Sequence, residues 1–254
     1  MKEWCSMSTV EKVFKILELL GSGPHSFTEI QKRLQLPKST AWSLLSRMES
    51  SGSIEKDETG KYQLGHLILR LGLAMYNNLN VKIQAEPIMA KMAQETNEIS
   101  HLCILDKSRM DVVYIAKIEG PSSIHIKTSV GSSNPSYCTA AGKVFLSHLS
   151  HRDLEDYLQN ITLISYTSNT ITKKEDLMLE LADVREKGFA IDRGEHIEYS
   201  TGISAPVLDH QGICIAALSI TGFTERMLEQ QESFIQLVKQ YASELSHLMG
   251  YPHK

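Results

Sequence analysis

The sequence lacks the cysteine and histidine patterns of metal sites and disulfide frameworks. Its 4 cysteines are scattered through 254 residues, and no two of them form a Cys-x-x-Cys pair. Neither a disulfide-stabilised secreted fold nor a zinc cluster is expected from such spacing, and the scattered thiols favour a reducing cytoplasm. The 10 histidines show no His-x-His or His-Glu-x-x-His spacing. We therefore predict no metal and no cofactor.

The chain also has no long apolar run. No run approaches the roughly 18 residues that are needed to cross a bilayer, and the first residues, MKEW, do not have the pattern of a signal peptide. We expect neither membrane insertion nor secretion. With 42% hydrophobic and 22% charged residues the composition is that of an ordinary globular protein, and 254 residues can hold two modest domains.

A strong charge of either sign is missing too, but the net charge of −4 is unevenly distributed. Residues 1–80 hold 10 Lys and Arg against 8 Asp and Glu, whereas residues 81–254 hold 16 against 22. A slightly basic first part on an acidic second part fits a DNA-reading head on a body with another task.

Residues 28–52 predict two short helices joined by a tight turn. Thr28 is the predicted N-cap of the first helix, and Pro37 ends the pattern because proline disfavours helical geometry in the residue before it. A second helix, capped by a hydroxyl, is expected from Lys38 onward, with four apolar residues inward at helical spacing: Ala41, Leu44, Leu45 and Met48. The second helix of such a helix-turn-helix can enter the DNA major groove. Any small helical hairpin would have the same apolar spacing, so that alternative remains.

The flanking residues favour the DNA-binding interpretation. Between Glu29 and Glu49 there are four basic residues and no acidic one. Residues 53–56 and 61–64 are short alternating runs around a turn-rich tetrad, which indicates a β-hairpin and makes the motif winged. A helix is also expected over residues 10–20, with a stripe that packs under the second helix of the motif: Val10, Val13, Phe14, Ile16, Leu17 and Leu20.

Several short segments, namely residues 8–12, 15–17, 36–40, 44–45 and 62–65 together with Gly52, occur in a specific order and spacing. In these segments the chain resembles the isocitrate lyase regulator (IclR) family of bacterial transcription factors. The resemblance implies a dimeric regulator that reads palindromic operator DNA. Ser43 and Lys12 stand where the family usually has arginine, which indicates fewer or shifted phosphate contacts.

The acid-free basic run and this resemblance predict the DNA-facing residues. They are Thr28, Lys38, Ser39, Thr40, Trp42, Ser43, Arg47 and Lys61. Arg47 is expected to reach phosphate, whereas Thr40 and Trp42 are expected to determine which base pairs are preferred.

Residues 66–78 predict an amphipathic helix whose apolar stripe needs a partner: Leu67, Ile68, Leu71, Ala74 and Met75. The partner is either the second domain of the same chain or the same helix of another subunit. The resemblance and the two-fold symmetry of palindromic DNA favour the second, so we predict a homodimer, or a dimer of dimers. The predicted domains are 1–66 for the winged helix-turn-helix, 67–80 for the linker and dimerisation helix, and 81–254 for the effector-binding domain.

Helical and strand patterns mix in the rest of the chain. After a helix around residues 88–97, strands are expected at 99–105, 112–118, 124–128, 189–192, 203–208 and 213–220, and helices at 137–149, 152–158, 173–187 and 225–249. Hairpin links between the strands indicate an α+β domain around an antiparallel sheet. The resemblance implies that this domain has a GAF-like, effector-binding fold.

Residues 139–142, Thr-Ala-Ala-Gly, start a predicted helix with small side chains. Bare backbone N–H groups and the helix dipole form an anion site there, which a carboxylate can approach closely. The small residues could instead serve only to pack the helix on the sheet. The resemblance favours the ligand, because the matching family positions line the effector pocket.

The effector-binding residues that this reasoning and the resemblance imply are Cys138, Thr139, Ala140, Ala141, Asp192, Gly202, Ser219 and Thr221. Gly194, Tyr199 and Gly202 depart from the family's usual glutamate, glycine and cysteine, which indicates altered specificity. An aspartate that accepts from hydroxyls beside a carboxylate site suits a hydroxy, keto or sugar acid.

The predicted function is therefore a DNA-binding repressor or dual regulator of a catabolic operon, and not an enzyme. The alternative is an enzyme on a GAF-like domain, with Cys138 as nucleophile and His148 or His125 as base. A third interpretation is an interaction module whose pocket is filled by its own side chains, for which Tyr199 is the candidate.

Overall fold

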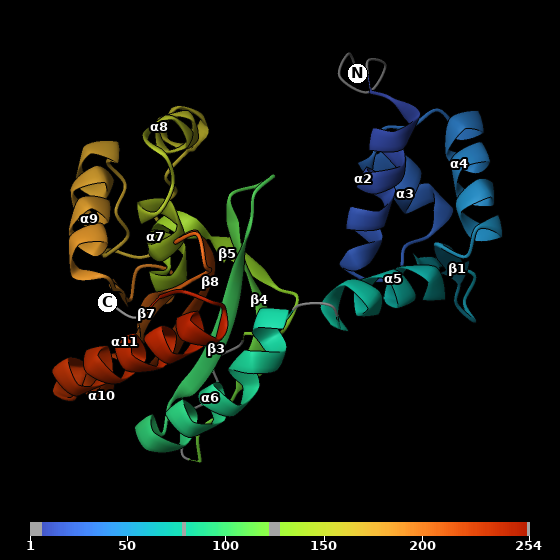
Figure 1. The fold of residues 1–254 in the computed structure, drawn as a ribbon. Coiled ribbons are helices and arrows are strands. Elements are labelled where there is room, and N and C mark those ends of the chain that lie inside the picture. The colour runs from blue at the N-terminus through green and yellow to red at the C-terminus, as the bar shows by residue number, and fades with distance from the viewer. Residues whose placement is uncertain (1–6, 78–79, 122–127, 253–254) are drawn as a thin grey trace. The chain divides into compact units, whose positions relative to one another are not determined.

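The computed structural model describes residues 7–77, 80–121 and 128–252 (Figure 1). The chain forms two compact units, Met1–Leu79 and Asn80–Lys254. In chain order, the first unit contains α2 (Thr9–Gly21), α3 (Phe27–Arg33), α4 (Lys38–Ser50), β1 (Ile54–Lys56), β2 (Tyr62–Leu64) and α5 (His66–Asn77). Among the described residues, no helix is both long and apolar enough to span a bilayer.

The first unit is a helix-turn-helix followed by a two-stranded wing. The four residues of α4 that were predicted to point inward are all buried: Ala41, Leu44, Leu45 and Met48. They pack with Ile16 and Leu20 of α2 and with Ile30 of α3 in one core. Strands β1 and β2 pair antiparallel, so the predicted hairpin is confirmed.

Both predicted helix caps in the motif are wrong. Ser26, not Thr28, caps α3: its hydroxyl accepts from the Glu29 N–H at 3.3 Å, and the Glu29 carboxylate accepts from the Ser26 N–H at 2.7 Å. In this reciprocal capping box Ser26 and Glu29 satisfy each other's backbone N–H groups, and the helix already begins at Phe27, so Thr28 lies inside it. Helix α4 has Pro37 as its N-cap and no side-chain cap, because the chain enters it directly from the proline.

The predicted stripe of α2 is correct only in its second half. Ile16 and Leu20 are buried, but Val10 is 64% exposed and Phe14 is 60% exposed. With 3.6 residues per turn, Val10 and Phe14 lie roughly 120° or more around the helix from Ile16, so they point away from the core. Val13, in the same turn as Phe14, packs against the core, so the predicted stripe was too wide. The first unit therefore leaves two large apolar side chains of α2 on its surface.

The second unit is an α+β domain, as predicted. It contains α6 (Asn80–Thr96), β3 (Ile99–Asp106), β4 (Asp111–Ile118), β5 (Ser133–Pro135), the 3-10 turn η1 (Ser136–Cys138), α7 (Ala140–Ser147), α8 (His151–Asn160), α9 (Lys174–Lys187), β6 (Ala190–Arg193), β7 (Ser200–Leu208), β8 (Cys214–Phe223), α10 (Thr224–Glu229) and α11 (Gln231–Leu248). Its six strands form one antiparallel sheet in the order β5-β4-β3-β8-β7-β6.

Three expectations for this unit need correction. The single final helix is two helices, α10 and α11, which are separated at Gln230, where the backbone is not helical. Helix α7 ends at Ser147, two residues earlier than predicted, and the short strand β5 was not predicted. The strand predicted at 124–128 lies, apart from Thr128, outside the described residues.

Helices cover the two faces of the sheet. Successive side chains of a strand point to opposite faces. On β7, Gly202 faces Ala140 of α7, whereas Ala205 lies beside Ala242 of α11. Figure 1 shows the same arrangement, with α6 and α11 on one side of the sheet and α7 and α9 on the other. The start of α7 thus lies over β7, which is next to the edge strand β6.

Candidate functional site

The exposed face of α4 carries the residues predicted to contact DNA. Trp42 is 66% exposed, and Lys38, Ser39, Ser43 and Arg47 are exposed as well. Thr40 is half-buried, so it lies at the edge of this face. The buried side of α4 holds the helix on its core, and the opposite side is free to enter a groove.

Two cations on this face have no acidic partner in the part of the chain that the structure describes. Lys38 and Arg47 form no ion pair with any described residue, whereas Lys56 on the wing is paired with Glu49 at 3.2 Å. Unpaired cations are available for phosphate oxygens. Thr28 on α3 and Lys61 beside β2 are exposed too. The structure thus presents all eight predicted DNA-facing residues at least in part to solvent.

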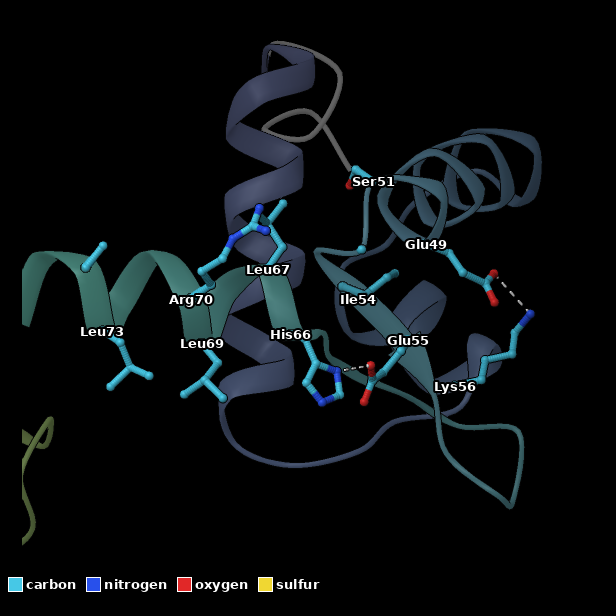
Figure 2. Close-up of a pocket in the computed structure, with 12 residues that line it drawn as sticks. Glu49, Ser51, Ile54, Glu55, Lys56, His66, Leu67, Leu69, Arg70 and Leu73 are labelled. Carbon is cyan, nitrogen blue, oxygen red and sulfur yellow. Dashed lines mark hydrogen bonds and ion pairs between the residues drawn. The ribbon is translucent and has the colours of Figure 1, made fainter.

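An open groove lies between the wing and α5 in the same unit (Figure 2). It has a volume of about 910 Å³, and Ile54, Leu67, Leu69 and Leu73 form its apolar part. A hydrogen bond and an ion pair border it: His66 Nδ1 lies 2.9 Å from Glu55 Oε2, and Lys56 Nζ lies 3.2 Å from Glu49 Oε2. None of the predicted DNA-facing residues lines this groove.

Helix α5 exposes more apolar surface than predicted. Leu71, in the predicted stripe, is 57% exposed, but Leu69 is 60% and Leu73 is 48% exposed outside it. Leu69 and Leu73 lie about one turn apart on one side of α5, whereas Leu71 points to nearly the opposite side. An exposed apolar patch usually marks a contact with another surface.

A small polar cavity in the second unit brings together most of the predicted effector residues. Its lining includes seven of the eight: Thr139, Ala140, Ala141, Asp192, Gly202, Ser219 and Thr221. The register of the sheet explains how they meet. Asp192 of β6 pairs with Gly202 of β7, and Gly202 pairs with Thr221 of β8, so the three form one row across the sheet beneath the start of α7.

The start of α7 presents backbone donors to this cavity. Thr139 is the N-cap, and its hydroxyl accepts from the Gly142 N–H at 3.3 Å. This uses one of the four N–H groups that lack a partner within a helix. Ala140 and Ala141, whose side chains are small, line the cavity beside their own N–H groups. The positive end of the helix dipole therefore faces the cavity, which favours negative charge there.

Hydrogen-bonding groups dominate the rest of the lining. Tyr114 accepts from Asn134 Nδ2 at 3.2 Å, and both residues line the cavity. Behind the wall, His101 is fully buried on β3, with Nε2 2.8 Å from Thr128 Oγ1 and Nδ1 3.5 Å from Thr221 Oγ1. Burial lowers the pKa of His101 to about 3, so the ring is neutral at physiological pH. The wall offers neutral donors and acceptors rather than cations.

Asp192 is the acidic group of the cavity. Its Oδ1 accepts from the Glu195 N–H at 2.7 Å. Burial raises the pKa of Asp192 to about 7, although the backbone hydrogen bond from Glu195 acts in the opposite direction. Near neutral pH this carboxyl can therefore either donate or accept a hydrogen bond.

The cavity is small, with a volume of about 40 Å³. This is room for a few water molecules, so an organic acid requires its walls to move apart. Tyr199 does not fill the space, because it is 69% exposed and lies outside the lining. His196 and Ile197, which precede it in the β6–β7 connection, do line the cavity.

Cys138, the eighth predicted residue, does not reach the cavity. Its side chain is fully buried, and its Sγ lies 3.8 Å from the Pro135 carbonyl oxygen. Burial raises the pKa of this thiol well above its usual range, and His148 bonds to the Val144 carbonyl oxygen at 2.9 Å instead of the thiol. A nucleophilic cysteine needs the thiolate and access, and this geometry gives it neither. His125, the other suggested base, lies outside the described residues.

Several lining residues were not predicted from the sequence: Tyr114, Thr128, Asn134, His196, Ile197 and Ser200. Ser200 could have been found, since it lies two residues before Gly202 on the same face of a strand. The others come from β4, β5 and irregular segments, whose positions depend on long-range pairing.

Comparisons with known proteins agree with both units. Residues 9–58 match the family model described as the IclR helix-turn-helix domain, and residues 73–247 match the model of the bacterial transcriptional regulator IclR C-terminal region. The chain is 33% identical over 249 residues to the HTH-type transcriptional regulator KdgR of Escherichia coli K12, covering 97% of this chain and 94% of that protein.

Solved structures have the same architecture. The IclR of Thermotoga maritima is 29% identical, with a TM-score of 0.72 over 96% of this chain and 99% of that one. An IclR homologue from Microbacterium hydrocarbonoxydans, solved in complex with 4-hydroxybenzoate, has a TM-score of 0.82 at 23% identity, over 96% of this chain and 99% of that one. The second likeness is one of fold.

Proposed function

The chain belongs to the IclR family of bacterial transcriptional regulators, and on that premise we propose that it binds operator DNA as a dimer and senses a small organic acid. The single observation that carries this proposal is the coexistence of two sites in one chain. One is an exposed recognition helix with unpaired cations, and the other is a polar cavity at the start of a helix. We further propose that it represses, or both represses and activates, a catabolic operon in the cytoplasm.

For DNA binding, α4 enters the major groove. Trp42 and Thr40 contact base edges, and Lys38 and Arg47 contact phosphates on either side. The exposure of Trp42 supports this, because a 66% exposed tryptophan gains burial when the groove covers it. The wing, with Lys61 next to β2, contacts the adjacent backbone.

For dimerisation, α5 pairs with α5 of a second subunit. The exposed leucines of α5 and the apolar part of the neighbouring groove provide the contact area. Two recognition helices related by two-fold symmetry then match a palindromic operator.

For sensing, the effector carboxylate lies at the amides of Ala140 and Ala141, and its hydroxyl or keto groups meet the hydroxyl-rich wall and Asp192. The polar lining supports a hydroxy, keto or sugar acid, because apolar ligands would leave these buried groups without partners. 4-Hydroxybenzoate, the ligand in the Microbacterium hydrocarbonoxydans structure, also has a carboxylate and a hydroxyl.

Calorimetric titration of the full-length protein with hydroxy, keto and sugar acids tests the sensing proposal. At least one acid should bind the wild-type protein. Asp192→Ala should make the binding free energy of that acid less favourable by roughly 1–3 kcal/mol, because hydrogen bonds to its hydroxyls are lost. If no acid binds and the cavity stays closed, the domain is an interaction module instead. If Asp192→Ala binds the acid as tightly as wild type, the acid binds elsewhere.

A further inference from the structure

A buried ammonium lies behind the cavity. Lys143, on α7, is 1% exposed, although lysine side chains almost always reach water. Its Nζ donates to Glu180 Oε1 at 3.0 Å, to the Ile191 carbonyl oxygen at 3.1 Å and to Glu195 Oε1 at 2.5 Å. One side chain thus connects α7 to α9, to β6 and to the segment that follows β6.

These contacts lead from Lys143 to the cavity. Glu195 binds Lys143 through its side chain, and its backbone N–H donates to Asp192 Oδ1 at 2.7 Å. Thr170 Oγ1 holds the Glu195 carbonyl oxygen at 2.6 Å from the other side. Asp192 lines the cavity, and Lys143 follows Ala140 and Ala141 on the same helix. The ammonium therefore fixes both ends of the proposed binding site.

The charges in this cluster do not balance. The Lys143 ammonium has two carboxylate partners, Glu180 and Glu195, and the Asp192 carboxyl accepts from the backbone of Glu195. The second oxygen of Glu195, Oε2, is buried and has no hydrogen-bond partner among the described residues, which is costly for a carboxylate. With Glu180 and Glu195 ionised, one ammonium faces two carboxylates, so the cluster next to the cavity carries an excess of negative charge.

Asp192 responds to this excess. After burial, which is the largest effect, the negative charge of Glu195 raises the pKa of Asp192 and the positive charge of Lys143 lowers it. The other titratable groups facing Asp192 are Tyr114 of β4, Cys138 of η1 and His196, and all three are neutral near pH 7, since burial raises the pKa of Tyr114 and of Cys138 and lowers that of His196. Lys143 and Glu195 are therefore the charged neighbours that act on Asp192.

We propose that Lys143 and Glu195 are positioning residues of the effector cavity, which hold the Asp192 carboxyl in place and set its charge. A protonated Asp192 offers the ligand a hydrogen-bond donor, whereas an ionised Asp192 only accepts. The pair thereby selects between effectors that present a carbonyl oxygen and effectors that present a hydroxyl at this point. The role in effector selection rests on the proposed sensing function. The coupling between the charges of Glu195, Lys143 and Asp192 is a property of the protein without a ligand.

The test is a pH titration of the Asp192 carboxyl carbon by NMR, on full-length protein labelled with ¹³C at aspartate, with the signal assigned by its loss in Asp192→Asn. Glu195→Gln keeps the shape and the backbone N–H but removes the charge. It should lower the Asp192 midpoint by about 1 pH unit. The Asp192 carboxylate is then no longer repelled by the Glu195 carboxylate, while the Lys143 ammonium still attracts it. Glu180→Gln is the matched control, since it removes a carboxylate from the same ammonium farther from Asp192, and it should move the midpoint less.

An Asp192 midpoint that is the same in Glu195→Gln as in wild type would overturn the proposal. If Glu195→Gln does not fold, the Asp192 titration is repeated on the double variant Lys143→Gln/Glu195→Gln, which removes the buried pair together and leaves no charge without its partner. The Asp192 midpoint should then fall as well, because the repulsion by Glu195 outweighs the attraction by Lys143, and an unchanged midpoint would equally reject the coupling. Neither titration needs an effector, so failure of the coupling and failure to bind any acid are separate results.

Discussion

The backbone of Gly142 lies so close to Ser136 that a methyl group at position 142 would overlap the Ser136 backbone. This contact presses the first turn of α7 against η1 and thereby sets where the amides of Ala140 and Ala141 lie. The glycine is required for close approach rather than for an unusual backbone angle, since its φ is not positive. The anion site therefore depends on a residue that need not touch the ligand.

Gly142→Ala should destabilise the second unit by about 1–3 kcal/mol, as an inserted carbon does in a packed interior. Thermal unfolding of the full-length protein, followed by circular dichroism, measures this. Gly21→Ala is the matched control, because a methyl group on this helical glycine of α2 meets no atom within 4 Å. Equal melting temperatures for Gly142→Ala and wild type would show that η1 can move away without loss.

Arg47→Ala should weaken binding to all DNA sequences alike and reduce the salt slope by about one, because one phosphate contact is lost. Fluorescence anisotropy with DNA selected by the protein from a random pool, measured over a range of salt concentrations, gives both quantities. Lys91→Ala removes an equally exposed cation from α6 and should change neither. An unchanged slope for Arg47→Ala would mean that α4 faces DNA differently.

Leu71→Asp should dissociate the dimer and leave a folded monomer. Leu71 is 57% exposed within its own chain, so the charge costs little there, but burying it against a second subunit would cost several kcal/mol. Light scattering measures the mass, and circular dichroism measures folding. Leu179→Asp makes the same change at a leucine of α9 that is 72% exposed, and its mass should equal that of wild type. A dimeric Leu71→Asp would place the subunit contact elsewhere.

Gln35→Gly should stabilise the first unit by about 0.5–1 kcal/mol. Gln35 is in the turn between α3 and α4 with a φ of 44°, a left-handed conformation that glycine adopts without strain. Gln31→Gly, inside α3, should instead destabilise it by about 1 kcal/mol. Urea unfolding followed by tryptophan fluorescence reports on this unit, because Trp42 lies on α4 and the sequence has no tryptophan after residue 79. The same sign for both variants would contradict the assigned turn.

The helix-turn-helix could be predicted because its information is local. Leu44, Leu45 and Met48 recur at the helical period, and Pro37 marks the boundary between the helices. The caps were missed for two reasons. Ser26 and Thr28 each have a glutamate or glutamine three residues later, so the sequence pattern of a capping box fits both. The hydroxyls of Ser39 and Thr40 lie inside α4, whose N-cap is Pro37. These errors move helix ends by one or two residues and leave the fold unchanged.

The cavity could be predicted only in part. Asp192, Gly202 and Thr221 were found through the resemblance, and the structure shows why they meet: three paired strands place them in one row. The pairing of Tyr114 with Asn134 across β4 and β5 leaves no local signal in the sequence. Cys138 was misplaced because its neighbours in sequence line the cavity, yet its own side chain turns into the core behind them.

The central claim is that an acid in the cavity at the start of α7 controls DNA binding. Its most direct test is the anisotropy assay on selected DNA, performed with and without the acid found by calorimetry. The assay compares the wild type with two variants that fill the cavity. Gly202→Ala adds a methyl group 3.5 Å from the Ala140 side chain, which is an ordinary contact, and Ala140→Leu adds more bulk where the carboxylate must approach.

Without acid, both variants should bind DNA with wild-type affinity, because the first unit is unchanged. With acid, wild-type affinity for DNA should change at least fivefold, the lower range of allosteric coupling. Gly202→Ala should need more acid for the same change, and Ala140→Leu should not respond. A response of Ala140→Leu at the same acid concentration as wild type would contradict the account, since the acid would then act from another site.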